Sequence, residues 1–492
     1  MLHRFKRTRK TGEGSLHPQP KGWGIRDPLH SRSNKYNSGY RLIAQIEHRQ
    51  MHCGTCTCEA SGELRRAHDM TDLVKDLAYK IAFDLSKGKQ PKARKWNRFK
   101  YFTKLLDKCY AYFPKAKDDN STTQDKKQLK ARTWTGFKYF TGALDKYYLY
   151  LLTNRIEDLY EAYDICIDAL KSEPGYSTLF GLCYNIGIEL FEIEDYEKAE
   201  IMFLSSIKIK KHAGAYCGLA ACRRYVWHLN EAYLDALDAK SLDTELALPH
   251  VIIGSIYLDA GSYATKLYDK AIENYNIATK NDPNFPYPVF GIGLVHFKRE
   301  EFDLAKDYFG KVDELIGDEK YEVLRLSSRL ALATCHKQTN EIEKYFEDVR
   351  EIRWKISRES VFNRAAFEAI VGNEDESLRL LGQALRKKFA TATDVRYDPD
   401  FRGLRNNIKF MRLLDLNKED SEIIRGIRDF ILGENASIKA SFESTIGNYE
   451  VAVKLLKEAL DNKEISMEEI EEDSHFEGLR THPNYKDGLP KL

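Results

Sequence analysis

Residues 286–309 read PYPVFGIGLVHFKREEFDLAKDYF, and their small and aromatic residues decide the fold. Ile292-Gly293 and Phe297 fall on one predicted helix, and Ala305 and Phe309 fall on the next. Gly or Ala lets two helices approach closely, and an aromatic ring fills the groove beside them. The stretch therefore predicts a helix–turn–helix unit.

The same pattern returns along the chain at a period of about 33 residues. A third unit carries about five extra residues around GSYATKLY, which we interpret as an insertion at the turn between its helices. The matching positions are Ile186-Gly187, Ala199 and Phe203; Leu219-Ala220, Ala232 and Ala236; and Ile253-Gly254, Tyr257, Ala271, Tyr275, Ala278 and Pro283.

These residues resemble the tetratricopeptide repeat (TPR), a helix–turn–helix of about 34 residues with Leu-Gly and Tyr on the first helix, Ala and Phe on the second, and Pro at the exit. Glu173-Pro174 and Asp282-Pro283 supply the exit, because proline lacks the N–H that would continue a helix. The resemblance covers about 155–320, weakens over 321–350 and then recovers. It implies an all-α, right-handed TPR solenoid.

Two duplications flank this array. Residues 92–113 (KARKWNRFKYFTKLLDKCYAYF) return 38 positions later as 130–151 (KARTWTGFKYFTGALDKYYLYL). The stripe of Trp134, Leu144 and Tyr148 cannot be buried by one helix alone, so we expect the copies to pack their aromatic faces in a core. A binding role for these aromatic residues is the alternative, because Tyr and Trp are common at interaction hot spots.

The second duplication aligns 366–410 with 441–485 at an offset of 75 residues. We name its halves copy 1 (351–415) and copy 2 (416–492), each a TPR-like hairpin followed by an acidic, aromatic, Leu-Arg turn. That turn resembles a closing module found after TPR arrays, which covers the last apolar face. For Arg405 and Arg480 we expect pairing with nearby acids or helix-end carbonyls, with an anion site as the alternative.

The N-terminal part differs in character. Residues 1–38 have no apolar period and predict a disordered basic arm, 39–64 alternate like a β-hairpin, and DMTDLVKDLAYKIAFDLSKGK predicts an amphipathic helix. The predicted segments are the arm (1–38), a small α+β N-terminal cap (39–90), the duplicated aromatic helices (91–154), the TPR array (155–350), and the two copies.

Charge is divided along the chain. Residues 1–100 carry 22 Lys/Arg against 9 Asp/Glu, whereas the remainder carries 55 against 66. The basic head could attract phosphates or an acidic partner, but a solvated disordered arm is the commoner explanation of such a block of charge. No apolar run reaches the roughly 18 residues of a membrane helix, the start lacks the apolar core of a secretory signal, and the cysteines lie mostly in apolar helical contexts, so we expect a cytoplasmic protein.

The densest group of possible metal ligands is HRQMHCGTCTC, with His52, Cys53, Cys56 and Cys58. Cys53 and Cys56 have the spacing of a zinc knuckle, but no second CxxC or HxxxH pair follows to close a tetrahedral site. We therefore favour cysteines as small strand residues over zinc. The sequence contains no GxxxxGK[ST], strand-linked GxGxxG, HExxH or GxSxG motif, so we predict no catalytic residues, no cofactor and no enzymatic activity.

We interpret the chain as a non-catalytic scaffold that binds a peptide or helix of a partner protein on its concave TPR surface. Chaperone-clamping TPR domains use Lys and Asn on their first helices, and the matching Tyr184, Ile188 and Phe290 place that use in doubt. The candidate partner contacts are Tyr184, Glu189, Tyr216, Arg223, His250, Tyr257, Phe290 and His296.

Two alternatives remain open. A regulatory or sensory module for a separate enzyme would contact nucleic acid through residues 1–38, and its binding would weaken steeply with salt. An enzyme with a metal at Cys53, Cys56 and Cys58 would purify with stoichiometric zinc.

Overall fold

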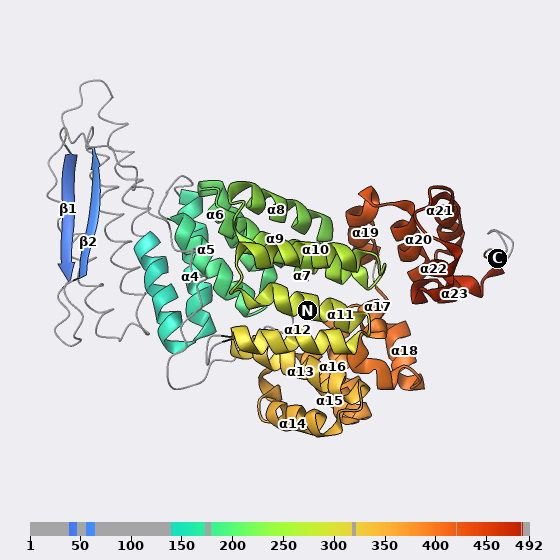
Figure 1. The fold of residues 1–492 in the computed structure, drawn as a ribbon. Coiled ribbons are helices and arrows are strands. Elements are labelled where there is room, and N and C mark those ends of the chain that lie inside the picture. The colour runs from blue at the N-terminus through green and yellow to red at the C-terminus, as the bar shows by residue number, and fades with distance from the viewer. Residues whose placement is uncertain are drawn as a thin grey trace. The chain divides into compact units, whose positions relative to one another are not determined.

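A computed structural model describes residues 139–172, 179–316, 321–419, 421–483 and 485, together with the backbone of two strands. Contacts divide these residues into two compact units. The first unit holds the described residues up to 191 together with 198–211, and the second holds 192–197 with everything described from 212 onward. Figure 1 shows helices packed as hairpins in both.

In the first unit, helical residues 139–153 precede α4 (Ile156–Ser172), α5 (Leu179–Glu192) and α6 (Tyr196–Ile209). Leu144 and Tyr148 are buried, which supports core packing for the aromatic stripe. Trp134 and the first copy of that duplication lie outside the described residues. Ser206 of α6 donates a hydrogen bond to the Phe180 carbonyl of α5 at 2.7 Å, which ties the hairpin together.

Two strands are also described, β1 (Gly39–Ile46) and β2 (Cys56–Glu63), and their backbones pair antiparallel with Gly39 opposite Glu63. They agree with the predicted hairpin over 39–64. The helix expected after it, and the basic arm, lie outside the described residues, so the α+β cap as a whole stays a prediction.

The second unit continues the array as antiparallel helix pairs, in which each first helix contacts its own second helix. The pair from 321 onward shows that the helical period persists where the TPR pattern weakens. The helices are α7 (Ala213–Tyr225), α8 (Leu229–Leu242), α9 (Ala247–Gly261), α10 (Leu267–Asn281), α11 (Pro286–Lys298), α12 (Phe302–Leu315), α13 (Glu322–Gln338) and α14 (Ile342–Arg353).

Equivalent glycines hold three of the hairpins together. A Cβ added to Gly187, Gly254 or Gly293 would lie 2.7–2.9 Å from the aromatic ring of the second helix in the same hairpin. Those rings are Phe203, Tyr275 and Phe309, each nearly or fully buried. In the α7–α8 pair the same positions are taken by two small residues, Ala220 and Ala236, both fully buried. The predicted repeat positions are therefore equivalent in space.

Copy 1 and copy 2 have matching local structures. Gly372 and Gly447 both adopt a left-handed φ, of 85° and 83°, where a first helix ends. The next residues, Asn373 and Asn448, donate to Glu368 and Glu443 respectively. The elements are the 3₁₀ helix η2 (Ile356–Arg358), α15 (Val361–Val371), α16 (Glu374–Arg386), α17 (Ala392–Tyr397), η3 (Pro399–Leu404) and α18 (Ile408–Leu416) in copy 1, and α19 (Ser421–Phe430), η4 (Ile431–Gly433), α20 (Ala436–Thr445), α21 (Tyr449–Asp461), α22 (Met467–Glu472), η5 (Ser474–Phe476) and α23 (Glu477–Arg480) in copy 2.

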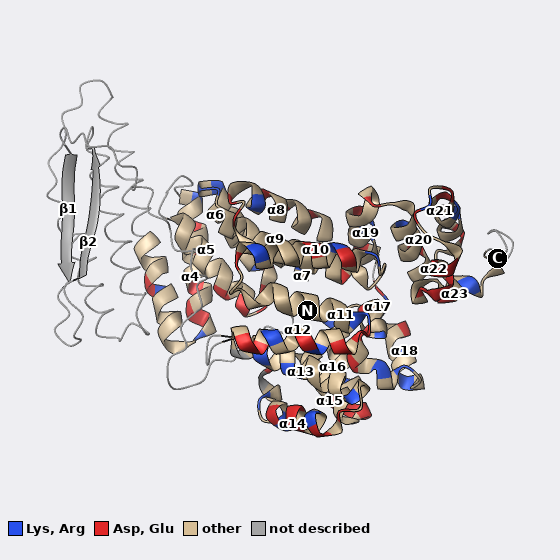
Figure 2. Cartoon of the chain, in the orientation of Figure 1, with Lys and Arg blue, Asp and Glu red and all other residues tan. Residues whose placement is uncertain are grey.

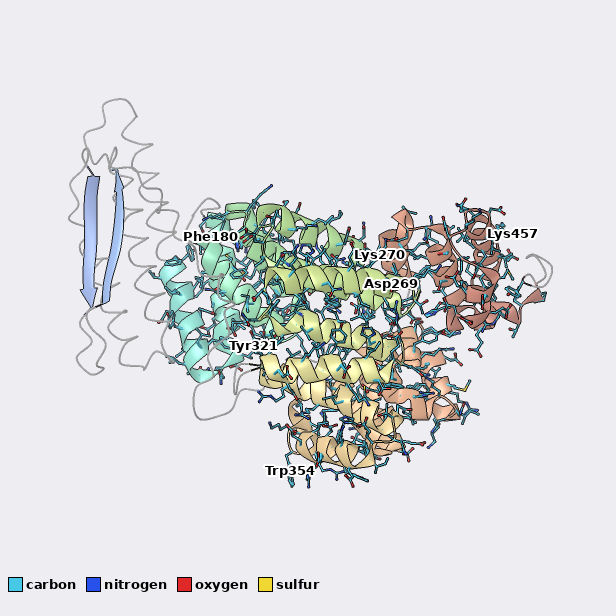
Figure 3. All side chains as sticks on the ribbon, in the orientation of Figure 1. Phe180, Asp269, Lys270, Tyr321, Trp354 and Lys457 are labelled. Carbon is cyan, nitrogen blue, oxygen red and sulfur yellow. The ribbon has the colours of Figure 1, made fainter. Side chains whose placement is uncertain are left out.

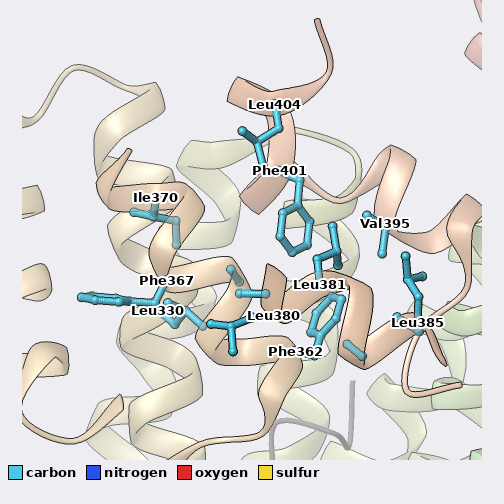
Figure 4. Packing of buried hydrophobic residues seen from close by; sticks show 14 of the residues in the cluster. Leu330, Phe362, Phe367, Ile370, Leu380, Leu381, Leu385, Val395, Phe401 and Leu404 are labelled. Atoms are coloured by element: carbon cyan, nitrogen blue, oxygen red, sulfur yellow. The ribbon is translucent and has the colours of Figure 1, made fainter. Parts of the chain in front are cut away.

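The acidic, aromatic turn of each copy closes an apolar core. In copy 1, Phe401 and Leu404 from η3 pack with Phe362 and Leu381 of the preceding hairpin (Figure 4). Phe476 and Leu479 occupy the equivalent places in copy 2.

The two arginines of these turns make structural contacts. Arg405 donates to the Arg396 carbonyl at 3.1 Å and pairs with Glu300 at 2.9 Å. Arg480 donates to the carbonyls of Ile470 and Asp473. The predicted structural pairing is therefore confirmed for both.

Candidate partner-binding surface

The first helices of successive hairpins contact one another in the order α7, α9, α11, α13 and α15. This continuity makes one surface from first helices alone, which is the surface that a TPR solenoid offers to a partner. Ala221, Leu248 and Tyr287 are half-buried members of α7, α9 and α11. An ion pair joins two of these helices: Nη2 of Arg224 donates to Oδ1 of Asp259 at 2.7 Å, and Nε lies 2.6 Å from Oδ2.

Two predicted contact residues belong to the first unit. Tyr184 packs its ring against Phe203 with centroids 5.9 Å apart, so it faces the second helix of its own hairpin. Glu189 is 1% exposed. Both lie on α5, as the sequence predicts, and their role in binding stays a prediction.

Four predicted residues of the second unit also face their own second helices. Arg223 pairs with Asp235 at 2.9 Å, and His250 lies 3.4 Å from the Asn274 amide oxygen. Phe290 packs against Phe309, and His296 stacks on Tyr308 while lying 2.5 Å from Glu301. These side chains tie first helices to second helices, and partner contact would be a second role for them.

The last two predicted residues are buried in different surroundings. Tyr216 is 8% exposed on α7. Tyr257 on α9 contacts Tyr233 of α8 and Phe430 of α19, with ring centroids 6.0 and 5.2 Å apart. Copy 2 therefore touches the array at one of the predicted positions.

The inserted turn between α9 and α10 is a point where the array meets both copies. From copy 1, Asp394 accepts a hydrogen bond from Ser262 Oγ at 2.9 Å. From copy 2, His475 Nε2 lies 2.9 Å from the Ser262 carbonyl oxygen. Thr265 donates to Asp473 at 3.2 Å, and Lys266 donates to the Glu464 carbonyl at 2.7 Å. The five extra residues of the third repeat thus serve as a docking turn.

Tyr263 lies at the centre of this turn and is fully buried. Its hydroxyl donates to Glu419 at 3.1 Å, and its ring packs against Phe442 of copy 2. Burial and the neighbouring Glu419 charge raise the pKa of the Tyr263 hydroxyl, which keeps it a neutral donor. The sequence revealed the insertion but gave no sign of what the tyrosine meets.

A buried cation forms the second joint. Lys298, at the end of α11, lies 2.7 Å from Asp394 and 3.1 Å from Asp398 of copy 1. Burial alone would lower the pKa of Lys298, but the two carboxylates outweigh burial and raise it. The ammonium therefore stays charged and holds copy 1 on the array. Sequence spacing could not show this joint, because about 100 residues separate its partners.

The side chains of the predicted metal ligands lie outside the described part of the chain. His52 and Cys53 fall outside the described residues, and only the backbone of Cys56 and Cys58 is described, in β2. Within the part of the chain that the structure describes, no group of three or more His, Cys, Asp or Glu residues is placed to hold a metal ion. In the same part, no helix is long and apolar enough to cross a membrane.

Comparison with solved structures found similar proteins, whereas comparison by sequence found none. No family model matches the chain, and no curated protein matches it. Solved structures similar to it include MamA (22% identity, covering 32% of this chain and 89% of that chain, TM-score 0.27). A thermophilic TPR protein of Thermus thermophilus is 14% identical over 39% of this chain and 98% of its own, with a TM-score of 0.34. A tetratricopeptide repeat protein of Parabacteroides merdae is 13% identical over 57% of this chain and 99% of its own, with a TM-score of 0.38.

The contacts within the chain identify its repeating unit. Three hairpins place a glycine of the first helix against an aromatic ring of the second, and the first helices contact one another in sequence order. The described helices of the array are therefore repeated helix–turn–helix hairpins, in agreement with the pattern that resembles the tetratricopeptide repeat.

Proposed function

We propose that the protein is a non-catalytic scaffold that binds a peptide or helix of another protein on the surface formed by its first helices. The observation that carries this proposal is the unbroken contact from α7 through α9 and α11 to α13. Such a surface suits an extended or helical segment, because each repeat adds one more helix to the same face.

We also place the protein in the cytoplasm and propose that residues 39–90 form a small α+β N-terminal cap. The five cysteines whose side chains are described (Cys166, Cys183, Cys217, Cys222 and Cys335) are buried free thiols, which supports a reducing compartment. The antiparallel pairing of β1 and β2 supports the cap.

Site-specific photocrosslinking in the native host would test the proposal. A photoreactive phenylalanine analogue replaces Ala221, Leu248 or Tyr287 on first helices, and Leu234 or Leu304 on α8 and α12 provides exposed controls on second helices. We expect one partner to be crosslinked from the first-helix positions and not from the controls. Crosslinking from α8 and α12 alone would refute the choice of surface.

A further inference from the structure

An unusual row of exposed side chains follows α14. Ile342, Phe346 and Trp354 are 46%, 62% and 83% exposed, and Arg350 completes their four-residue spacing. Residues spaced by four form a ridge along one side of a helix, and such ridges pack against other helices. Trp354 continues the last turn of α14 with helical dihedral angles, and Figure 3 shows it at the outer edge of the ribbon.

Charges of both signs lie beside this row (Figure 2). Glu343 is exposed in the first turn of α14, and Arg350 and Arg353 are exposed in its last turn. Within the described ranges, no ion pair or hydrogen bond engages the side chains of these three residues. The neighbouring Arg329 and Lys344, by contrast, pair with Glu351 and Glu341.

The exposed side chains of α14 complement those of a second α14 helix that runs in the opposite direction. If two α14 helices cross antiparallel with these ridges interdigitated, a twofold axis at position 348 sets Ile342 beside Trp354 and Phe346 beside Arg350. The same axis brings Glu343 to Arg353. One pairing is apolar, one sets a guanidinium against an aromatic ring, and one is an ion pair.

We propose that α14 is an interface for a second copy of this chain. This surface consists of a second helix and goes beyond the first-helix surface assigned to the partner protein. Asp348, Val349 and Ile352 are buried on the opposite side of α14, so the helix can dock a second copy without leaving its own hairpin. The self-complementary order of charges favours a closed pair over an open chain of molecules.

The contact would be weak and reversible. One helix from each chain gives an interface at or below ~1,200 Å², the size at which transient associations are found. Aromatic residues and arginine carry much of the energy in such contacts, so we expect Phe346→Ala to weaken dimerisation about tenfold or more.

Sedimentation velocity of the full chain over a wide concentration range tests the proposal. We expect a monomer–dimer equilibrium in the wild type. Glu343→Arg and Arg353→Glu each set like charges against each other at both ends of the pair, and each should weaken dimerisation about tenfold or more. Mixed in equal amounts, the two variants supply opposite charges at both contacts, so the mixture should recover the wild-type affinity.

Leu304→Glu on α12 is the matched control, because Leu304 is 48% exposed on another second helix. It should dimerise like the wild type, and far-UV circular dichroism should show the same helix content for all variants. A chain that stays monomeric at every concentration would overturn the proposal. So would a dimer that is indifferent to the single charge changes, or a mixture no tighter than either variant alone.

Discussion

The contact between Gly254 and Tyr275 allows a quantitative prediction. A methyl group at Gly254 would lie 2.7 and 2.8 Å from two carbon atoms of the Tyr275 ring, closer than real Cβ contacts come. The ring has little room to move, because it also lies close to the next hairpin, where a Cβ built on Gly291 would come within 2.4 Å of the same ring. Tyr275 is 1% exposed, and its hydroxyl shares a 3.1 Å hydrogen bond with Ser255.

Three opposing effects set the size of the change for Gly254→Ala. Replacing Gly by Ala inside a helix gains about 1 kcal/mol of helix propensity. Overpacking a closed core costs about 1–3 kcal/mol, and the upper value applies because the ring lies close to glycines of two hairpins, Gly254 and Gly291. Losing the hydrogen bond of a displaced Tyr275 costs about 1 kcal/mol. We expect a net loss of about 3 kcal/mol in the stability of the α9–α10 hairpin.

The assay should read this hairpin locally, because a repeat array need not unfold in one step. Hydrogen exchange read by mass spectrometry on peptides from α9 and α10 would show faster exchange in Gly254→Ala, and urea unfolding followed by circular dichroism would give the global effect. Gly310→Ala on α12 is the control, because a Cβ at Gly310 meets nothing within 4 Å. It should gain about 0.5–1 kcal/mol from helix propensity.

The comparison of the two variants decides the outcome. If Gly254→Ala stabilises the protein as Gly310→Ala does, the ring is not held between two hairpins and the proposed role of the repeat glycines is wrong.

Three further predictions concern the joints between the array and the copies. Lys298→Met leaves two buried carboxylates without their cation and should cost about 3–5 kcal/mol, seen as easier proteolysis of copy 1. In Gly426→Ala, the new methyl group would lie 2.5 Å from the Trp227 carbonyl oxygen of the array, so α19 should separate from α8 and exchange hydrogen faster. Burial raises the pKa of Asp473, but hydrogen bonds and charge from His475 outweigh burial and lower it. The docking of copy 2 should therefore be constant above about pH 4, the ordinary carboxyl pKa, and weaken as pH falls below it, as hydrogen exchange of copy 2 would show.

Periodicity predicted the parts of the fold that depend on neighbours in sequence. The spacing of Gly187, Gly254 and Gly293 placed each of them against an aromatic ring, because adjacent helices in a hairpin are close in both sequence and space. The offset of 75 residues likewise predicted that Gly372 and Gly447 share one local structure. Sequence pattern does not separate partner contacts from contacts within a hairpin, because a helix face that packs on a second helix carries the same residue types as one that binds a partner.

Contacts between segments that are distant in the chain have no periodic pattern in the sequence that would predict them. Position 400 in copy 1 corresponds to position 475 in copy 2, yet the two residues dock on different partners. Asp400 accepts a hydrogen bond from Thr334 of α13 at 2.7 Å, whereas His475 lies 2.9 Å from the Ser262 carbonyl oxygen in the docking turn. A duplicated module keeps its internal packing, since that depends on its own residues, while the side chain at this position, which faces the array, differs with what it meets. At this position the difference between the duplicated segments marks where each copy docks, whereas the identical pair Asp398 and Asp473 contacts different parts of the array, Lys298 and Thr265.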